Sequence, residues 1–317
     1  MRTEYIILII ILTILLLFQL LVFYCYMATF YNNKKKLLDV YSLPDKDLYL
    51  PYKPELDILY YTLLDLKYEK VKIKSFDKTT LSAKYYQVSD QKIIQIMFHG
   101  YKGSGETDLC GAHKLARDLN HNILLVDQRG AGETSSNTIT FGIKERLDCL
   151  EWIKYCINRF GSDIKIILVG VSMGASTILM ASELDLPENV KGIIADSPFT
   201  TPKEIISKVI KDMKMPPKLV YPFIKIAAKE FGRFNLEETN SIKAVKNSKI
   251  PILVIHGDRD NFVPCEMSKQ IADNSNGNVQ FELFPKAGHG FSFMTDTERY
   301  KQITQKFYEK CLKEANY

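Results

Sequence analysis

The sequence has no closely paired cysteines and no stripe of basic residues. Zinc sites and disulfide scaffolds are usually recognised by C-x-x-C spacing or by a dense cysteine pattern, and neither occurs here. We therefore predict isolated buried thiols, with no metal and no other cofactor. The net charge is only +5 and the lysines and arginines are scattered, which argues against a nucleic-acid partner. The cysteines are Cys25, Cys110, Cys149, Cys156, Cys265 and Cys311.

Charge is absent from Tyr5 to Met27, where isoleucine, leucine, valine and phenylalanine predominate. A run of this length matches the roughly 20 apolar residues that cross a bilayer. A secretory signal would be shorter and would end in small residues, whereas this run leads into Tyr24-Cys25-Tyr26. The residues before Cys25 are also too large for a bacterial lipoprotein acceptor. We predict a retained transmembrane anchor over residues 1–31, which makes the lipid bilayer a partner of the chain.

The orientation of this anchor depends on few charges. Lys34, Lys35 and Lys36 follow the apolar run, whereas Arg2 and the amino terminus precede it. This excess of positive charge after the run favours a cytoplasmic location for the remainder of the chain, at the cell membrane. An outward-facing domain is the open alternative.

The length of 317 residues suits one large α/β domain after the anchor. Residues 32–68 are predicted to form a connector with one docking helix. From residue 69 to residue 317, apolar strands alternate with helices, which predicts a mostly parallel sheet with helices on both faces. A helical insert at about residues 198–248 is interpreted as a cap over an apolar pocket or as a plain cover for the core. The predicted buried strands are Ile93 to Phe98, Ile123 to Val126, Ile164 to Val169, Val190 to Ala195, Ile252 to Ile255 and Val279 to Phe284.

The most informative motif is Gly170-Val171-Ser172-Met173-Gly174, between an apolar run and a predicted helix. This pattern at a strand-to-helix junction is typical of a nucleophile elbow. The turn is so sharp that the serine backbone is strained, and the residues two positions away must lack bulk. Ser172 would then project from the top of the sheet. A glycine-rich turn that happens to contain serine is the alternative, so the interpretation depends on an acid, a base and an oxyanion site elsewhere.

Two later loops supply an acid and a base. Asp258 and Asp260 both follow the strand that ends at Ile255. We favour Asp260 because it lies deeper in the loop, and we interpret Asp258 as a turn former. His289, which lies between two glycines after the last strand, is the predicted base.

The other histidines are assigned structural roles. His99 and His256 each end a strand before a glycine, and we predict that they anchor loops by hydrogen bonds. His113 and His121 lie in or beside a helix, and we predict that they are at the surface.

The predicted oxyanion hole consists of two backbone amides. One is that of Tyr101, in the loop after Phe98, and the other is that of Met173, which follows the serine. Lys102 and Glu106, near the first loop, are interpreted as surface charges.

The order Ser172, Asp260, His289, together with the elbow and the His99-Gly100-Tyr101 and Asp127 to Gly132 loops, resembles an α/β-hydrolase. More narrowly, the chain resembles the membrane-anchored bacterial serine hydrolases of the serine-aminopeptidase-like and Bem46-like group, from about Val71 onward. The resemblance implies an eight-stranded, mostly parallel sheet, a cap after the sixth strand and a metal-free acyl-enzyme mechanism.

The chain departs from this family pattern in two places. The oxyanion loop lacks the triple glycine of many lipases, which argues against close lipase kinship. The turn after Gly132 reads Glu133-Thr134-Ser135, where relatives often have a serine two residues after the glycine.

A serine at the elbow favours esters, thioesters or amides as substrates, whereas an aspartate would indicate a dehalogenase or an epoxide hydrolase. We expect a serine hydrolase that cleaves a small carboxylic ester or thioester. A serine aminopeptidase-like enzyme acting on a peptide-like amide is the alternative, and it needs a carboxylate such as Glu204 or Glu237 to hold the substrate amine. The alternative of another class is a catalytically inactive, membrane-bound binding protein.

Overall fold

An eight-stranded sheet forms the centre of the computed structural model, which describes residues 2–34 and 49–313. The first two strand pairings are antiparallel and the others are parallel, which confirms the predicted mostly parallel sheet. In the order in which they lie side by side, the strands are β1 (Glu69–Lys74), β2 (Thr80–Tyr86), β4 (Asn122–Asp127), β3 (Ile93–Phe98), β5 (Lys165–Val171), β6 (Val190–Asp196), β7 (Ile252–Gly257) and β8 (Val279–Phe284).

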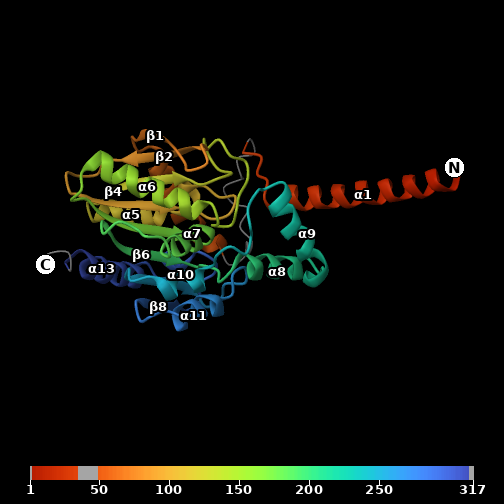
Figure 1. Cartoon of the computed structure of the whole chain (residues 1–317). Coiled ribbons are helices and arrows are strands. Elements are labelled where there is room, and N and C mark those ends of the chain that lie inside the picture. The colour runs from red at the N-terminus through yellow and green to blue at the C-terminus, as the bar shows by residue number, and fades with distance from the viewer. Residues whose placement is uncertain (1, 35–48, 314–317) are drawn as a thin grey trace.

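Two layers of helices cover the sheet, one on each face (Figure 1). Alternate side chains of a strand point to opposite faces, so that Ile96 of β3 packs in one layer and Met97 in the other. Trp152 and Cys149 are fully buried in the first layer, and the burial of Cys149 was predicted. The first layer contains α6 (Glu145–Phe160), α7 (Met173–Ala181), α10 (Ser241–Asn247) and α11 (Cys265–Asp273). The second contains α3 (Lys53–Leu64), α5 (Cys110–Asp118), α12 (Ser292–Thr295) and α13 (Thr297–Lys313).

Two further short turns and two long helices lie between these elements. The short turns are η1 (Leu50–Tyr52), before α3, and α4 (Gly105–Asp108), before α5. The long helices are α8 (Pro202–Asp212) and α9 (Pro217–Glu230), which lie between β6 and β7 at the position of the predicted insert. Thr201 begins α8 by accepting a hydrogen bond from the Glu204 amide. The buried faces of α8 and α9 belong to a third apolar cluster, which also includes Phe141 and Met173.

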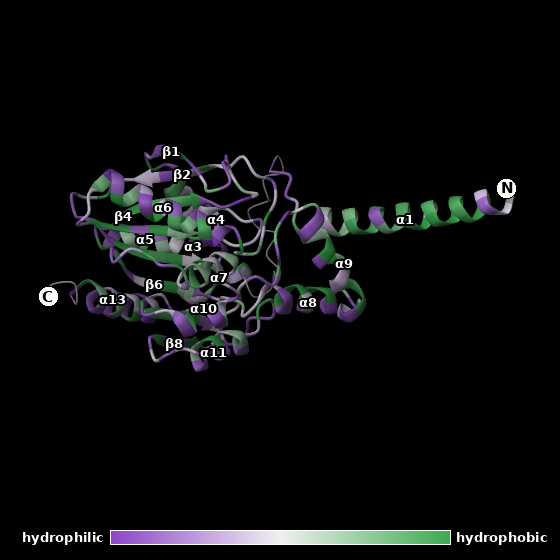
Figure 2. Cartoon of the chain, in the orientation of Figure 1, coloured by the Kyte–Doolittle hydropathy of each residue, from purple (hydrophilic) through white to green (hydrophobic). Residues whose placement is uncertain are grey.

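The N-terminal helix α1 (Arg2–Thr29) projects away from the domain (Figure 1). It is long and apolar enough to cross a membrane. Figure 2 shows that hydrophobic residues predominate along this helix. A helix that is apolar on all sides and largely uncovered by protein is consistent with a membrane span or with a signal sequence.

The C-terminal end of α1 is packed into the domain. Val22 and Phe30 are fully buried, and the Phe30 ring makes edge-to-face contacts with Phe141 and Phe234. Directly after the helix, the Asn32 amide donates a hydrogen bond to the carbonyl of Asn137. The helix is therefore joined to the domain by side-chain packing as well as by the chain.

The connector is described only in part. Of residues 32–68, those from 35 to 48 lie outside the described residues, and these include Lys35 and Lys36, on which the orientation argument depends. The predicted docking helix corresponds to α3, whose Leu59 and Leu63 are buried against the second layer.

Candidate active site

Ser172 lies in a strained turn between β5 and α7. Its φ of 54° and ψ of −117° are unfavourable for a residue with a Cβ. The flanking glycines explain how the turn fits. A Cβ on Gly170 would lie 2.5 Å from the Gly174 backbone, and one on Gly174 would lie 2.0 Å from the Phe98 carbonyl oxygen. The strand and the helix can therefore approach each other only because both positions lack side chains, as the motif predicts.

Three predicted site residues form a continuous chain of hydrogen bonds. His289 Nε2 lies 2.9 Å from Ser172 Oγ, and His289 Nδ1 lies 2.6 Å from Asp260 Oδ2. Because an ionised carboxylate can only accept, the ring hydrogen is on Nδ1 and is donated to Asp260. Nε2 then has a free lone pair and accepts from the Ser172 hydroxyl. A general base needs this arrangement to remove a proton from a nucleophile.

The two competing aspartates have different partners. The Asp260 side chain is fully buried, and its Oδ1 accepts hydrogen bonds from the amides of Phe262 and Val263, at 2.9 and 2.7 Å. Asp258 instead accepts a hydrogen bond of 2.6 Å from the Lys286 amide. The structure thus brings Asp260, and not Asp258, to the histidine, while Asp258 joins two loops.

A second histidine contacts the same carboxylate. His256 Nε2 lies 3.0 Å from Asp260 Oδ2 and 2.9 Å from the Val263 carbonyl oxygen, and both of these groups are acceptors. Nε2 therefore carries the hydrogen, and Nδ1 accepts from Ser268 Oγ at 2.6 Å. A hydrogen-bonding role for His256 was predicted from the sequence, but its contact with the acid was not. The spacing of four residues between His256, at the end of β7, and Asp260, in the loop that follows, is the signal that could have indicated it.

Burial and hydrogen bonding act in opposite directions on Asp260. Burial alone would raise its pKa, but the charge that His289 acquires on protonation and the hydrogen bonds from His256 and His289 outweigh this effect. Together they hold the pKa of Asp260 well below its usual range. The carboxylate therefore stays ionised and can orient the imidazole.

The two predicted oxyanion amides border the serine. Tyr101 follows Gly100, which lies close to the serine. A Cβ added to Gly100 would be 3.8 Å from Ser172 Oγ. Met173 is the first residue of α7, where backbone amides have no partner within the helix. Within the described residues, neither the Tyr101 amide nor the Met173 amide donates a hydrogen bond to protein. Asp108, which the sequence analysis did not identify, supports the loop by accepting from the Gly100 amide at 2.8 Å.

The loop that carries His289 is held by residues at the end of β6. Ser197 Oγ accepts a hydrogen bond of 3.2 Å from the Gly290 amide and donates one of 2.9 Å to Asp196. Asp196 is enclosed by protein, and this burial raises its pKa to about 6. The hydrogen bonds from Ser197 and Tyr300 and the charges of the nearby histidines lower the pKa, but by less than burial raises it. Sequence reasoning missed both residues because their link to the histidine loop is a tertiary contact.

A cavity of about 340 Å³ lies beside Ser172. Its apolar lining comes from α3, from the α4–α5 region and from the region of α12 and α13. Within the described residues, no side chain of α8 or α9 lines it, so the predicted cap does not shape this cavity. The principal apolar lining residues are Leu56, Tyr60, Leu109, Phe293, Met294 and Tyr300.

Two histidines predicted at the surface are buried. His113 packs edge-to-face on Tyr86, and burial, together with the charge of Arg117, lowers the pKa of His113 to about 3. His121 accepts a hydrogen bond from Gln95, and burial lowers the pKa of His121 to about 4. Both prediction errors have the same cause, because side chains from distant segments cover positions that look exposed in the sequence.

A predicted surface charge is also buried. Glu106 is only 9% exposed and pairs with Lys84 of β2, so it contributes to packing. The carboxylates that would have served an aminopeptidase have partners outside the cavity. Glu204 contacts the Thr200 hydroxyl, and Glu237 contacts Tyr221 and Lys225.

The thiols and other metal-binding side chains are dispersed. All six cysteines are free, and five of them are buried while Cys265 is partly exposed. In the part of the chain that the structure describes, no group of three or more His, Cys, Asp or Glu side chains is arranged to hold a metal ion. The His289 ring instead forms hydrogen bonds with Ser172 and Asp260.

Comparison with known proteins identifies related sequences. Residues 114–315 match the sequence model of the prolyl oligopeptidase family. The chain is 22% identical over 191 residues to the uncharacterised protein YqkD of Bacillus subtilis, a match that spans 60% of this chain and 63% of that protein. It is also 22% identical over 237 residues to the protein bem46 of Schizosaccharomyces pombe, spanning 73% of this chain and 74% of the relative.

Solved structures share the fold. An esterase of Pyrococcus furiosus superposes with a TM-score of 0.65 at 22% identity, covering 79% of this chain and 93% of the esterase. A puromycin-hydrolysing peptidase of Mycobacterium tuberculosis superposes with a TM-score of 0.63 at 16% identity, covering 78% of this chain and 39% of the peptidase. At these identities the similarity shows the α/β-hydrolase fold alone.

Proposed function

The chain belongs to the prolyl oligopeptidase family of α/β-type hydrolases, and on this premise we propose that it is a serine hydrolase that cleaves a carboxylic ester or thioester. We assign Ser172 as the nucleophile, His289 as the general base and Asp260 as the residue that orients the base. The observation that carries this proposal is the unbroken hydrogen-bond chain from Ser172 Oγ through the His289 ring to Asp260.

In the proposed reaction His289 Nε2 removes the proton from Ser172 as its oxygen attacks the acyl carbonyl. The imidazolium that forms is stabilised by Asp260, which holds the hydrogen on Nδ1. His289 then returns the proton to the leaving alcohol or thiol, and an acyl-enzyme remains. Water, activated by the same histidine, releases the acyl group in the second half of the reaction.

The negative charge on the carbonyl oxygen is assigned to the amides of Tyr101 and Met173. Neither amide has a protein acceptor in the described residues, so both can donate to an oxyanion without losing another hydrogen bond. A donor of this kind contributes about 100- to 1000-fold to the rate of acyl transfer.

The cavity favours an ester over an aminoacyl amide. An aminopeptidase needs a carboxylate free to hold the substrate amine, and the lining carboxylates Asp108 and Asp196 already accept hydrogen bonds from Gly100 and Ser197. The remaining lining is mostly apolar, which suits a small or medium acyl chain.

A substrate panel tests this proposal. The full chain, in detergent, is given p-nitrophenyl esters, acyl thioesters and aminoacyl amides, beside Ser172→Ala and a control variant, Ser275→Ala, just beyond the C-terminal end of α11. We expect ester turnover in the wild type and the control, and none in Ser172→Ala. Retained turnover in purified Ser172→Ala would sink the assignment, and a preference for aminoacyl amides would establish the aminopeptidase alternative.

We further propose that α1 is a single membrane span that holds the enzyme at the cell membrane, with the domain on the cytoplasmic side. In this division residues 1–31 are the anchor, 32–68 the connector and 69–317 the hydrolase domain, with an insert at about 198–248. The apolar character of α1 supports the span, and the three lysines that follow it in the sequence, Lys34 to Lys36, support the orientation. Protease accessibility of the domain in right-side-out and inverted vesicles tests the orientation.

A further inference from the structure

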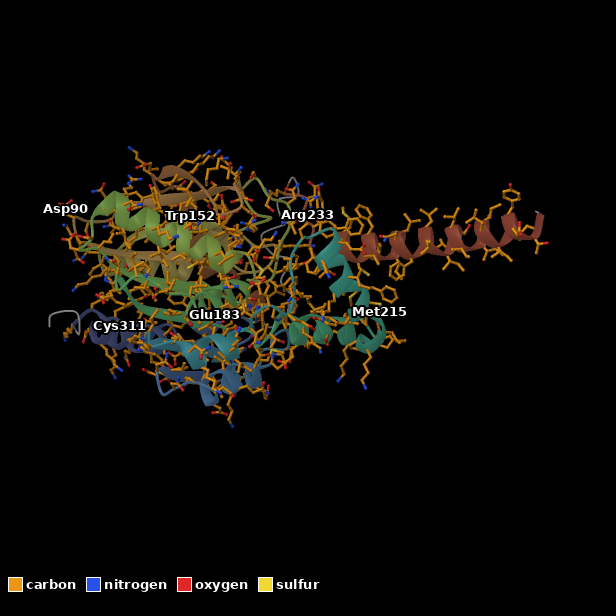
Figure 3. All side chains as sticks on the ribbon, viewed as in Figure 1. Asp90, Trp152, Glu183, Met215, Arg233 and Cys311 are labelled. Carbon is orange, nitrogen blue, oxygen red and sulfur yellow. The ribbon has the colours of Figure 1, made fainter. Side chains whose placement is uncertain are left out.

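The α8–α9 turn, residues 213–219, includes the first residues of α9 and exposes three large apolar side chains. Met213 is 63% exposed, Met215 36% and Leu219 68%. Single apolar residues are common on protein surfaces, but three of this size in one short turn indicate an interaction surface. Figure 3 shows Met215 at the end of the α8–α9 hairpin, which projects from the domain on the side from which α1 emerges.

Contacts between α9 and α1 relate this turn to the apolar span. The ring of Phe223 lies 5.9 Å from that of Phe18, and the ring of Phe231 lies 5.2 Å from that of Phe23. Before Val22, which is buried, every residue of α1 from 3 to 21 is exposed. At about 1.5 Å per residue this exposed stretch is about 28 Å long, close to the roughly 30 Å of a bilayer's hydrocarbon core.

This length match places the membrane surface at α9. If residues 3–21 of α1 fill the hydrocarbon core, the bilayer ends where α9 begins to cover α1. Phe223 contacts Phe18 within that stretch, so α9 reaches the headgroup level or slightly below it. Phe231 pairs with Phe23 and Phe223 pairs with Phe18, so the N-terminal end of α9, where the α8–α9 turn lies, points toward the exposed part of α1.

The charges around the turn suit an anionic surface. Eight basic and three acidic residues lie between Pro202 and Arg233. Asp212 is paired with Lys208 at 2.6 Å, while the described residues offer no carboxylate within ion-pair distance of Lys214 or Lys218. Lysine side chains can lie along apolar surface and extend their ammonium groups to phosphates.

We propose that the α8–α9 turn inserts into the leaflet at which α1 enters the domain, and that this leaflet is anionic. Met213, Met215 and Leu219 lie at the boundary between headgroups and acyl chains, and Lys214 and Lys218 contact lipid phosphates. The proposal rests on α1 being a membrane span, as proposed above. It assigns the insert a role in holding the domain against the bilayer instead of shaping the cavity.

Depth-dependent fluorescence quenching tests this proposal with the full chain in phosphatidylglycerol vesicles. The wild type has a single tryptophan, Trp152, which is fully buried in α6 and far from Met215 in Figure 3, so it provides the baseline emission. Leu219→Trp adds a reporter in the turn. Phe18→Trp adds one in α1, and Leu283→Trp, at a position 40% exposed on β8, is the matched surface control.

We expect brominated acyl chains to remove at least about half of the added emission in Leu219→Trp and Phe18→Trp, and to leave Leu283→Trp unchanged. Unquenched Leu219→Trp beside quenched Phe18→Trp would overturn the proposal. Unquenched Phe18→Trp would overturn it as well, because α1 would then not cross the bilayer. Fluorophosphonate labelling of the same samples is recorded separately, so that loss of labelling with retained quenching counts against the proposed hydrolase activity alone.

Discussion

The Tyr101 hydroxyl donates a hydrogen bond of 2.8 Å to the backbone carbonyl of Thr29. This bond connects the loop after β3, which carries one proposed oxyanion amide, to the last residue of α1. The Tyr101 ring also stacks on Phe141, with 5.1 Å between centroids. The N-terminal helix and the candidate active site are therefore parts of one packed unit.

Tyr101→Phe should weaken this connection without removing the backbone amide. The ring stacking remains, but the Thr29 carbonyl loses its donor, which we expect to reduce stability by about 1 kcal/mol. We also expect kcat/KM for an ester to fall by about two- to fivefold, since the loop is less well held. Tyr61→Phe, at an exposed position on α3, is the control. Equal values for both variants and the wild type would contradict the coupling.

Asp260→Asn and Asp258→Asn distinguish the two aspartates. An amide at position 260 cannot stabilise the imidazolium and permits the wrong tautomer of His289, so we expect kcat to fall by about 10,000-fold. In Asp258→Asn the new side-chain carbonyl can still accept the hydrogen bond from the Lys286 amide, so we expect that variant to keep its activity within about threefold. Steady-state ester turnover measures both. The reverse ranking would show that the wrong residue has been assigned.

His256 should act on the reaction through Asp260. His256→Leu removes a hydrogen-bond donor from the buried carboxylate, and we expect kcat to fall by about tenfold while KM stays unchanged. His256→Gln keeps a donor and should recover part of the loss. A change in KM alone would contradict this role. An equal loss of kcat in both variants, together with a loss of fold measured by circular dichroism, would indicate a purely structural role.

Asp196 predicts a pH dependence of folding. Burial raises its pKa to about 6 in the folded protein, against about 3.9 in an unfolded chain. The folded state therefore binds this proton more tightly, and the stability that it contributes is full below about pH 4 and is lost as the pH rises through about 6.

Asp196→Asn resembles the protonated acid at every pH. Relative to the wild type, its free energy of unfolding should rise by about 2 kcal/mol between pH 4 and pH 7. Urea unfolding of both proteins at the two pH values measures this difference. A difference that is the same at both would show that Asp196 has an ordinary pKa.

Features that depend on local sequence could be predicted. Every residue from Ile166 to Val169 is apolar because this part of β5 is buried on both faces, and Gly170 and Gly174 are required by the turn itself. The family order of Ser172, Asp260 and His289 indicated which loops meet. The structure brings these side chains within hydrogen-bond distance, and their catalytic roles stay a prediction.

Features that depend on distant segments could not be predicted. His113 and His121 are buried by Tyr86 and Tyr308, which are far from them in the sequence. The bond from Tyr101 to Thr29 likewise joins residues that only the fold brings together. The apolar residues of α8 and α9 indicated a cap because composition alone cannot distinguish a surface that faces substrate from one that faces α1.

The most direct test of the central claim is labelling of the folded full chain with a fluorophosphonate, followed by mass spectrometry of the modified peptide. The probe reacts only with a serine whose proton a neighbouring base removes, so we predict a single adduct on Ser172 that is absent from Ser172→Ala and strongly reduced in His289→Ala. A folded wild-type protein that remains unlabelled, or an adduct on another residue, would contradict the account.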